Sequence, residues 1–414
     1  MKKYLFVAGF AGALLAGCSS SDVETTYEKE VLQYRDIPVE FSSFLGNTAD
    51  TRAGDAGSID LAALKTAAKG FGVFAYYHDN SSYSSTTSEV NFMYNEKVTF
   101  DTSKGWTYSP IKYWPNEFQT SGDGYSTNID KLSFLAYAPW EGTDGANTHL
   151  NAGTKTGEAG EVGILGFGNS DWSKTDNTVA GDVYVKYQTA KNPANSVDLL
   201  YAKETATDKL IDLTKPTTES KVKFNFAHAL SRLELAIRYE NDDNNNTNAN
   251  STNDMASETT ITLNSLTITG DKLGKDGMLN LRTGAWSSVS NAGTGYVLNA
   301  SINIGGTVGN KIVPKTYSSV MGDDDYFMFI PNGETTFTVT ANYTVTTTDT
   351  ALKNGKSEIT NNIVNTVKFT PAAGNAYKLK LAIGMVSVKL DADVTAWPTT
   401  PTDAGPVWLP INTK

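Results

Sequence analysis

Cysteine is almost absent from this chain of 414 residues, because Cys18 is the only one. A single cysteine excludes an intramolecular disulfide framework. Histidine is scarce too: none of the three histidines lies in a spaced ligand motif, which leaves little for a histidine-rich metal site. We therefore expect no metal ion and no cofactor, and the three are interpreted as structural residues: His78, His149 and His228.

Positive charge is also in short supply, with 34 lysines and arginines against 45 acidic residues and a net charge of -11. Proteins that bind DNA or RNA neutralise phosphates with basic residues, so this balance argues against a nucleic-acid partner. Charged residues make up only 19% and hydrophobic residues 39%, which excludes a disordered acidic chain. The length and composition predict a folded, sheet-rich protein of two domains, or of three small ones.

Long apolar runs are missing as well. The apolar stretch at 4–15 follows Met1-Lys2-Lys3 and is too short to span a bilayer of about 30 Å, so it is interpreted as a secretory signal. It ends in Leu15-Ala16-Gly17-Cys18, which resembles the lipobox of bacterial lipoproteins. That resemblance implies a signal peptide at 1–17, cleavage between Gly17 and Cys18, and acylation of Cys18. An ordinary signal peptide with a chance cysteine is the alternative.

Alternating apolar residues dominate the chain from residue 31 onward and predict strands. Pro38 starts the first of them, in which Val39, Phe41 and Phe44 are the apolar positions. The other predicted strands lie at 71–77, 90–100, 132–138, 197–202, 221–239, 259–269, 326–330, 335–346, 363–369 and 377–390.

Other segments break this pattern. One short helix is predicted at 59–68, with Gly70 as its stop. The polar stretch 203–220, which contains Pro216, predicts a domain boundary. Residues 241–254 are nearly all Asn, Asp, Thr and Ser, which predicts a loop.

Catalytic patterns are weak throughout, so we expect no enzyme. Gly166-Phe167-Gly168 lacks the helix that a phosphate-binding loop needs, and it is interpreted as a turn. Asp323-Asp324-Asp325 is interpreted as a solvated turn because it is not followed by the rest of a calcium loop. Four aromatic residues could form a sugar platform, although tryptophan in strand-rich domains mostly fills cores: Tyr113, Trp114, Trp140 and Trp172.

Several local patterns, in one order along most of the chain, resemble the fimbrillins of Bacteroidales, which are the pilins of type V pili and their Mfa-like relatives. These patterns are the lipobox at Cys18, Val39-Glu40-Phe41, Thr51-Arg52-Ala53, Phe71-Gly72-Val73-Phe74-Ala75-Tyr76, Tyr113-Trp114-Pro115, Leu135-Ala136-Tyr137-Ala138-Pro139, Phe226-Ala227-His228-Ala229-Leu230-Ser231-Arg232-Leu233-Glu234 and Val394-Thr395-Ala396-Trp397. Separately, Asp349-Thr350-Ala351 resembles an O-glycosylation acceptor motif of Bacteroidetes, with Thr350 as the acceptor.

The resemblance implies an all-β fold of two transthyretin-like β-sandwich domains in tandem, at 53–215 and 216–414. Residues 18–52 would be a tether and propeptide with the first strand. An arginine- or lysine-specific protease would cut between Arg52 and Ala53 and displace the strand of Val39, Phe41 and Phe44. Strand exchange would then join the subunits head to tail. The candidate donor strand lies in the C-terminal tail, at Val407, Trp408, Leu409 and Ile411.

The tail departs from a good strand, because four prolines each remove a backbone donor: Pro398, Pro401, Pro406 and Pro410. The function implied is a structural subunit of a fimbria at the outer membrane, with other fimbrial subunits, the protease and the membrane as partners. The alternative is a lipid-anchored monomeric adhesin, or a fimbrial anchor or tip protein, that binds a glycan or a host or bacterial surface protein. A glycan-degrading lipoprotein is the third and weakest alternative, since no acid pair is apparent.

Overall fold

The computed structural model describes residues 36–45, 61–66, 69–115, 118–120, 126–128, 130–142, 153–154, 158–216, 220–239, 259–290, 295–304, 317–321, 326–384 and 388–396. Within these ranges the regular secondary structure is almost entirely strand, which confirms the all-β prediction. The helical elements described are α2 (Leu61–Leu64) and a 3-10 turn at Pro193–Asn195. None of the described helices has the length and hydrophobicity of a membrane span.

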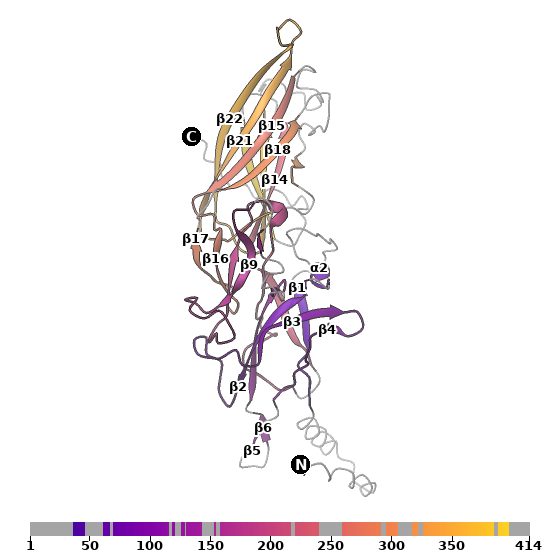
Figure 1. Cartoon of the computed structure of the whole chain (residues 1–414), viewed down its shortest axis with the longest axis vertical. Coiled ribbons are helices and arrows are strands. Elements are labelled where there is room, and N and C mark those ends of the chain that lie inside the picture. Colours follow the sequence, from indigo (N-terminus) through magenta and orange to yellow (C-terminus); the bar gives the residue numbers. More distant parts are fainter. Residues whose placement is uncertain are drawn as a thin grey trace.

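The N-terminal half is built on an eight-stranded sheet. Its order is β1 (Phe41–Leu45), β13 (Val222–His228), β11 (Leu200–Ala202), β7 (Lys131–Ala138), β2 (Phe71–His78), β3 (Met93–Asp101) and β4 (Gly105–Thr107), with β12 (Leu213–Thr214) also paired to β7. A small hairpin, β5 (Phe118–Thr120) and β6 (Ser126–Asn128), lies at the lower end in Figure 1.

A five-stranded sheet packs on one face of this first sheet. Its order is β17 (Trp286–Ser290), β16 (Asp276–Asn280), β10 (Tyr184–Gln188), β9 (Glu161–Gly168) and β8 (Gly153–Thr154). Their shared core contains Phe74 and Tyr137 from the first sheet and Ile164, Val185 and Leu279 from the second. The alternation of these strands thus places one apolar face of each sheet against the other, as in a β-sandwich.

The C-terminal half is a second sandwich. One sheet has the order β19 (Ser318–Ser319), β14 (Ser231–Tyr239), β23 (Asn375–Ile383) and β24 (Val388–Ala396), with β20 (Phe327–Phe329) paired to β14. The other has the order β18 (Tyr296–Ile304), β15 (Thr259–Gly270), β21 (Thr335–Thr348) and β22 (Lys356–Phe369). Leu235, Ile261, Phe337 and Leu379 belong to the single core between them.

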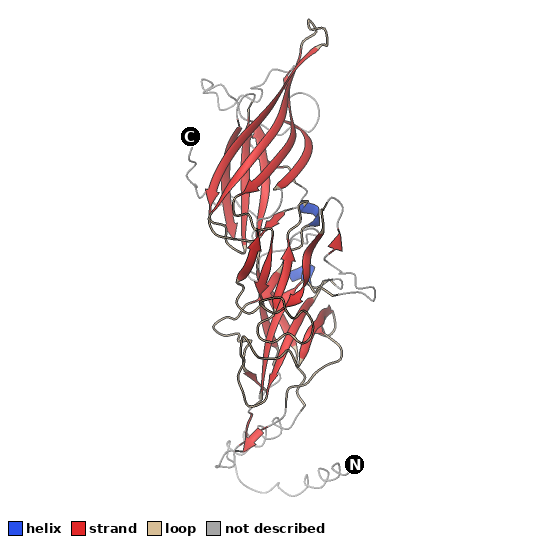
Figure 2. Cartoon of the chain, turned by 60° about the vertical axis from the view of Figure 1, so that its left-hand side comes forward, coloured by secondary structure: helices blue, strands red, loops and turns tan. Residues whose placement is uncertain are grey.

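The two sandwiches stack end to end and make the molecule elongated (Figures 1 and 2). Strand pairing crosses the predicted boundary between residues 215 and 216. Val222–His228 pairs with β1 and β11, and Asp276–Asn280 pairs with β10. The sheets of the N-terminal half therefore take three strands, β13, β16 and β17, from beyond residue 215.

Two local predictions are wrong in extent or type. Of the helix predicted at 59–68, the described residues 61–66 contain a single turn, Leu61–Leu64, because so short a segment gains few helical hydrogen bonds. Gly166-Phe167-Gly168 is not a turn but the end of β9. Gly166 has φ +152°, and the register between β9 and β10 shifts beside it, so glycine here serves a β-bulge inside the sheet.

Candidate functional site at the N-terminal strand

The strand predicted around Val39, Phe41 and Phe44 forms and lies at the edge of the eight-stranded sheet. β1 pairs in parallel with β13, and Phe41 lies opposite Val222 in the register. β1 is the last strand of this sheet, and no described strand is hydrogen-bonded to its other edge, although β4 and the bridge between Pro38 and Tyr113 lie close to that side. A terminal strand of this kind can be removed without breaking any other strand pair.

Phe41 is the anchor of β1 and is 1% exposed. Its ring stacks on Phe224 of β13, with centroids 5.2 Å apart. Tyr108 lies 5.4 Å away, and Phe134 meets Phe41 edge-on at 5.8 Å. Removing Phe41 would leave a hole among these aromatic rings, because interiors are packed too tightly to close over a lost side chain of that size.

The residues before β1 form hydrogen bonds with a second segment of the chain, residues 108–114. The amide of Val39 donates to the Lys112 carbonyl at 2.8 Å, and the amide of Trp114 donates to the Ile37 carbonyl at 2.9 Å. The Tyr108 hydroxyl donates to the Val39 carbonyl at 2.9 Å. Burial raises the pKa of Tyr108 to about 12, so its hydroxyl stays protonated and remains a donor at neutral pH.

The apolar side chains of residues 37–45 are mostly buried, unlike the side chains of an exposed tether. Ile37, Val39, Phe41 and Leu45 are all in the core, while Phe44 is half-buried under the Lys223 ammonium. Fully burying one such apolar side chain contributes about 1.5–3 kcal/mol, so four of them contribute on the order of 6–12 kcal/mol. That is as large as the whole stability of a typical domain, about 5–15 kcal/mol.

A cleft of about 250 Å³ lies beside the start of β13, next to this segment. Trp114, Leu213, Pro216 and Val222 are among the residues that line it, together with Lys221. The Lys221 ammonium lies 3.4 Å from the Glu40 carboxylate, in an exposed ion pair. The cleft thus has mixed apolar and charged walls, with Asp208 beside the lysines, and it adjoins the segment that leads into β1.

Most of the other predicted site residues fall outside the described ranges. These are Gly17, Cys18, Arg52, Ala53, Val407, Trp408, Leu409 and Ile411, and with them the prolines of the tail and His149. The predicted cleavage sites and donor strand therefore stay predictions. Thr350 is described and is exposed in the turn between β21 and β22.

The aromatic residues considered for a sugar platform are not brought together. Trp114 is buried and packs against Phe134, whereas Tyr113 is 51% exposed. Trp140 donates its Nε1 hydrogen to the Asn95 carbonyl at 3.2 Å, and Trp172 covers Gly168 at the end of β9. The contacts of the three tryptophans are those of packing residues, whereas Tyr113 lies at the surface.

The two described histidines have protein partners. His78 Nε2 lies 3.1 Å from the Ser133 hydroxyl, and burial lowers the pKa of His78. His228 Nδ1 lies 2.8 Å from Asp198 Oδ2 in a buried pair. Within the described residues, no group of three or more histidine, cysteine or acidic side chains could hold a metal ion.

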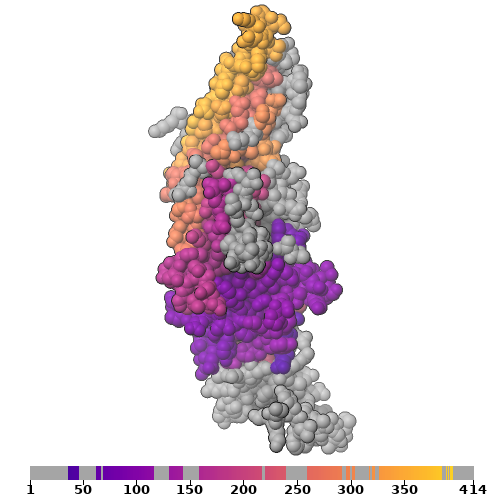
Figure 3. Space-filling model, viewed as in Figure 1, coloured from indigo at the N-terminus to yellow at the C-terminus, as the bar shows by residue number. Residues whose placement is uncertain are grey.

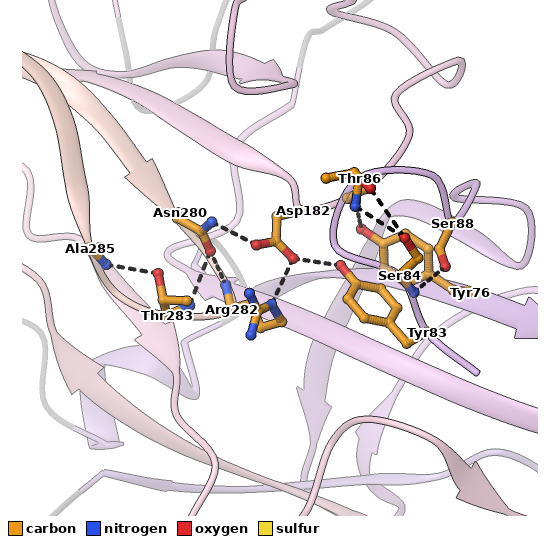
Figure 4. Close-up of polar contacts among 11 residues, drawn as sticks. Tyr76, Tyr83, Ser84, Thr86, Ser88, Asp182, Asn280, Arg282, Thr283 and Ala285 are labelled. Carbon is orange, nitrogen blue, oxygen red and sulfur yellow. Dashed lines mark hydrogen bonds and ion pairs between the residues drawn. The ribbon is translucent and has the colours of Figure 1, made fainter.

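A buried polar cluster that the sequence did not indicate surrounds Asp182 (Figure 4). Asp182 Oδ1 accepts hydrogen bonds from the Tyr83 hydroxyl and from Arg282 Nε, each at 2.7 Å. Its Oδ2 accepts from Asn280 Nδ2 at 2.7 Å, and the Tyr76 hydroxyl donates to the neighbouring Gly181 carbonyl at 2.8 Å. Single residues about 100 positions apart leave no pattern by which sequence reasoning could find them.

The chemistry of this cluster is structural. The hydrogen bond to Asp182 raises the pKa of Arg282, and burial raises the pKa of Tyr83, so both remain donors. The Asp182 carboxylate accepts hydrogen bonds from Tyr83, Asn280 and Arg282. With its oxygens occupied in this way, it is poorly placed to take a proton from a substrate. It ties the β16–β17 hairpin to the loop after β2.

Known proteins resemble this chain in sequence and in fold. A model of the fimbrillin-like family matches residues 51–397. A fimbrial protein of known structure from Bacteroides vulgatus is 17% identical, has a TM-score of 0.58, and covers 87% of this chain and 100% of its own. A fimbrial assembly protein of known structure from Parabacteroides distasonis is 12% identical and has a TM-score of 0.29. The match covers 87% of this chain and 100% of the other. A comparison with curated protein sequences finds no match.

Proposed function

Because the chain belongs to the fimbrillin-like family, we propose that it is a structural, non-catalytic subunit of a cell-surface fimbria that supports adhesion. It is exported as a lipoprotein, with Cys18 acylated and anchored in the outer membrane. A protease specific for arginine or lysine then cuts between Arg52 and Ala53. A strand of the next subunit replaces β1, and the subunits assemble head to tail.

The observation that carries the proposal is the placement of β1. It is an edge strand with buried apolar side chains, and it precedes Arg52 by only a few residues. Loss of residues up to 52 would expose the apolar groove around Phe224 and the unpaired backbone groups of β13. Such a groove favours an incoming strand, since backbone hydrogen bonds supply affinity and alternate side chains fix the register.

The replacement strand is proposed to come from the C-terminal tail, through Val407, Trp408, Leu409 and Ile411. A contact between the tail of one subunit and the groove of the next is heterologous, so it propagates into a filament. Replacing those four residues with serine should leave cleavage after Arg52 intact and abolish polymerisation, whereas loss of cleavage would show a folding defect.

The cleavage step is tested with three full-length chains: wild type, R52A and R35A. Incubation with an arginine-specific protease should give an N-terminus at Ala53 and multimers in the wild type and in R35A. The R52A variant should remain monomeric. Mass spectrometry of the N-terminus and sedimentation velocity measure the two outcomes. An Ala53 terminus in R52A, or multimers without any cut, would contradict the proposal.

The second candidate is a lipid-anchored monomeric adhesin, or an anchor or tip protein of the fimbria, with a glycan or a host or bacterial protein as its ligand. The buried segment around Val39 favours it in one respect, because an uncut chain is a complete, closed sandwich. The N-terminus of the form found on cells separates the candidates. Acylated Cys18 supports the anchor or adhesin, and Ala53 supports the polymerised subunit.

A further inference from the structure

β22 forms an open edge on the C-terminal sandwich. It is the last described strand of its sheet, pairs along its whole length with β21, and forms the left margin of the upper half in Figure 1. Atoms of this part of the chain lie at the surface in Figure 3. No described strand is hydrogen-bonded to the other backbone edge of this 14-residue strand, whereas β24 contacts it and Asn365 Nδ2 donates to the Val388 carbonyl at 2.7 Å. Such an edge offers a row of backbone donors and acceptors to an added strand.

The middle of this edge lacks the usual protection against pairing. Charges are confined to its ends, at Lys356, Glu358 and Lys368, and the nine residues between Glu358 and Lys368, 359–367, include neither charge nor proline. Two apolar side chains are left exposed along the strand, Ile359 at 60% and Val364 at 56%. Long edges of this type are where natural sheets accept another strand.

The sequence of β22 is complementary to itself when read backward. In an antiparallel pair of two copies centred on Ile363, residue numbers opposite each other add up to 726. Glu358 then faces Lys368 of the second copy on the outer face, and Thr360 faces Thr366. Each charge pair and each hydroxyl pair occurs twice, which is the self-complementarity that an isologous contact requires.

We propose that β22 is a homophilic interface at which a second copy of this chain docks edge to edge. The two four-stranded sheets become one sheet of eight strands, with Ile363 on the two-fold axis. Ile359 is covered opposite Val367 of the second copy, and the two Val364 side chains become diagonal neighbours. In this arrangement the backbone groups at the outer edge of β22 form hydrogen bonds, and the exposed side chains of Ile359 and Val364 are covered.

This contact stands apart from the proposed function, because it uses the opposite half of the molecule from β1. A head-to-tail contact lengthens a filament, whereas a two-fold contact stops at a pair. In a filament, β22 would join two neighbouring filaments side by side; in a lipid-anchored monomer, it would pair two molecules on one membrane.

Cysteine cross-linking tests the register in the full-length chain purified in detergent. I363C places two cysteines directly opposite each other, with Cα atoms about 4.5–5.5 Å apart, which suits a disulfide. T366C, three residues along the same strand, puts the two cysteines about 20 Å apart. I363C should give a disulfide-linked dimer that wild type and T366C lack. Equal cross-linking of the two variants, or none in I363C, would overturn the proposal.

Charge reversal supplies a test without cysteine. E358K and K368E each set like charges opposite each other twice, and each should weaken the dimer about tenfold in sedimentation equilibrium. The double variant E358K/K368E restores opposite charges across the interface and should restore the dimer. The double variant also breaks the two ion pairs that these residues make within one chain, Lys356–Glu358 and Glu334–Lys368. If the single variants weakened the dimer only through those intrachain pairs, the double variant would weaken it by the sum of both effects. A wild type that stays monomeric at high micromolar concentration would also overturn the proposal.

Discussion

Phe41 and Phe44 lie three residues apart in the same strand, yet their surroundings differ. Phe41 is enclosed by aromatic rings, and Phe44 is half-buried near Lys223. We expect F41A to lower the free energy of unfolding by about 3–5 kcal/mol, because it removes a buried ring and leaves a cavity. F44A should cost less than about 1.5 kcal/mol. Denaturant titration of the uncut chain measures both, and similar losses would contradict the assigned packing.

Lys275 is a buried charge whose cost depends on pH. Burial lowers its pKa from 10.5 to about 8, although the nearby Glu158 partly opposes this, and its ammonium lies 3.7 Å from the centroid of the Tyr296 ring. The folded-state pKa is the lower one, so the unfolded state binds more protons between pH 8 and 10.5, and stability rises with pH across that window. The penalty is fully present below pH 8.

K275M removes this penalty. The difference in unfolding free energy, wild type minus K275M, should therefore rise by roughly 3 kcal/mol between pH 7.5 and 10.5. Taking the difference cancels the titration of the buried tyrosines. K272M, which replaces an exposed lysine three residues away, is the matched control for loss of a positive charge. A difference that stays constant with pH would contradict the burial of a charged Lys275.

At the scale of elements, the alternation of apolar residues was enough to locate many strands. Phe71–His78 and Lys131–Ala138 lie within one residue of the predicted limits. The predicted run 377–390 is two strands, Asn375–Ile383 and Val388–Ala396, because alternation alone does not mark where a strand reverses. β9 was missed because its glycines, which serve a bulge, have the composition of a turn.

The β16–β17 hairpin is tied to the N-terminal half by the Asp182 cluster. We expect D182N to destabilise this tie by roughly 2–3 kcal/mol, because Arg282 loses its ion pair and one amide hydrogen must face another donor. Hydrogen exchange of residues 276–290 should speed up more than that of β21. D79N, which changes an exposed aspartate in the neighbouring loop, should leave both rates unchanged. Uniform acceleration would point to a global effect instead of a local one.

At the scale of the whole molecule, the sequence could predict an all-β chain with a buried first strand but not its partner. The parallel pairing of β1 with β13 joins Phe41 to Val222, which are 181 positions apart, and no local pattern encodes such a pair. Pro216 predicted a boundary because a polar stretch surrounds it. The pairing of β13 with β11 shows that the sheet continues past it. Long-range pairing is a property of packing, not of composition.

The return of β13 and β16 to the N-terminal sheets sets the order in which the protein can fold. A chain that leaves the ribosome or crosses a membrane with its N-terminus first has no complete N-terminal sandwich until β17 has emerged, at Ser290. Phe41 has no partner strand until β13 has emerged, and this pairing spans a long sequence separation, so it forms slowly. The first strand of the sheet in sequence is thus held by one of the last, so the N-terminal sandwich closes late in synthesis.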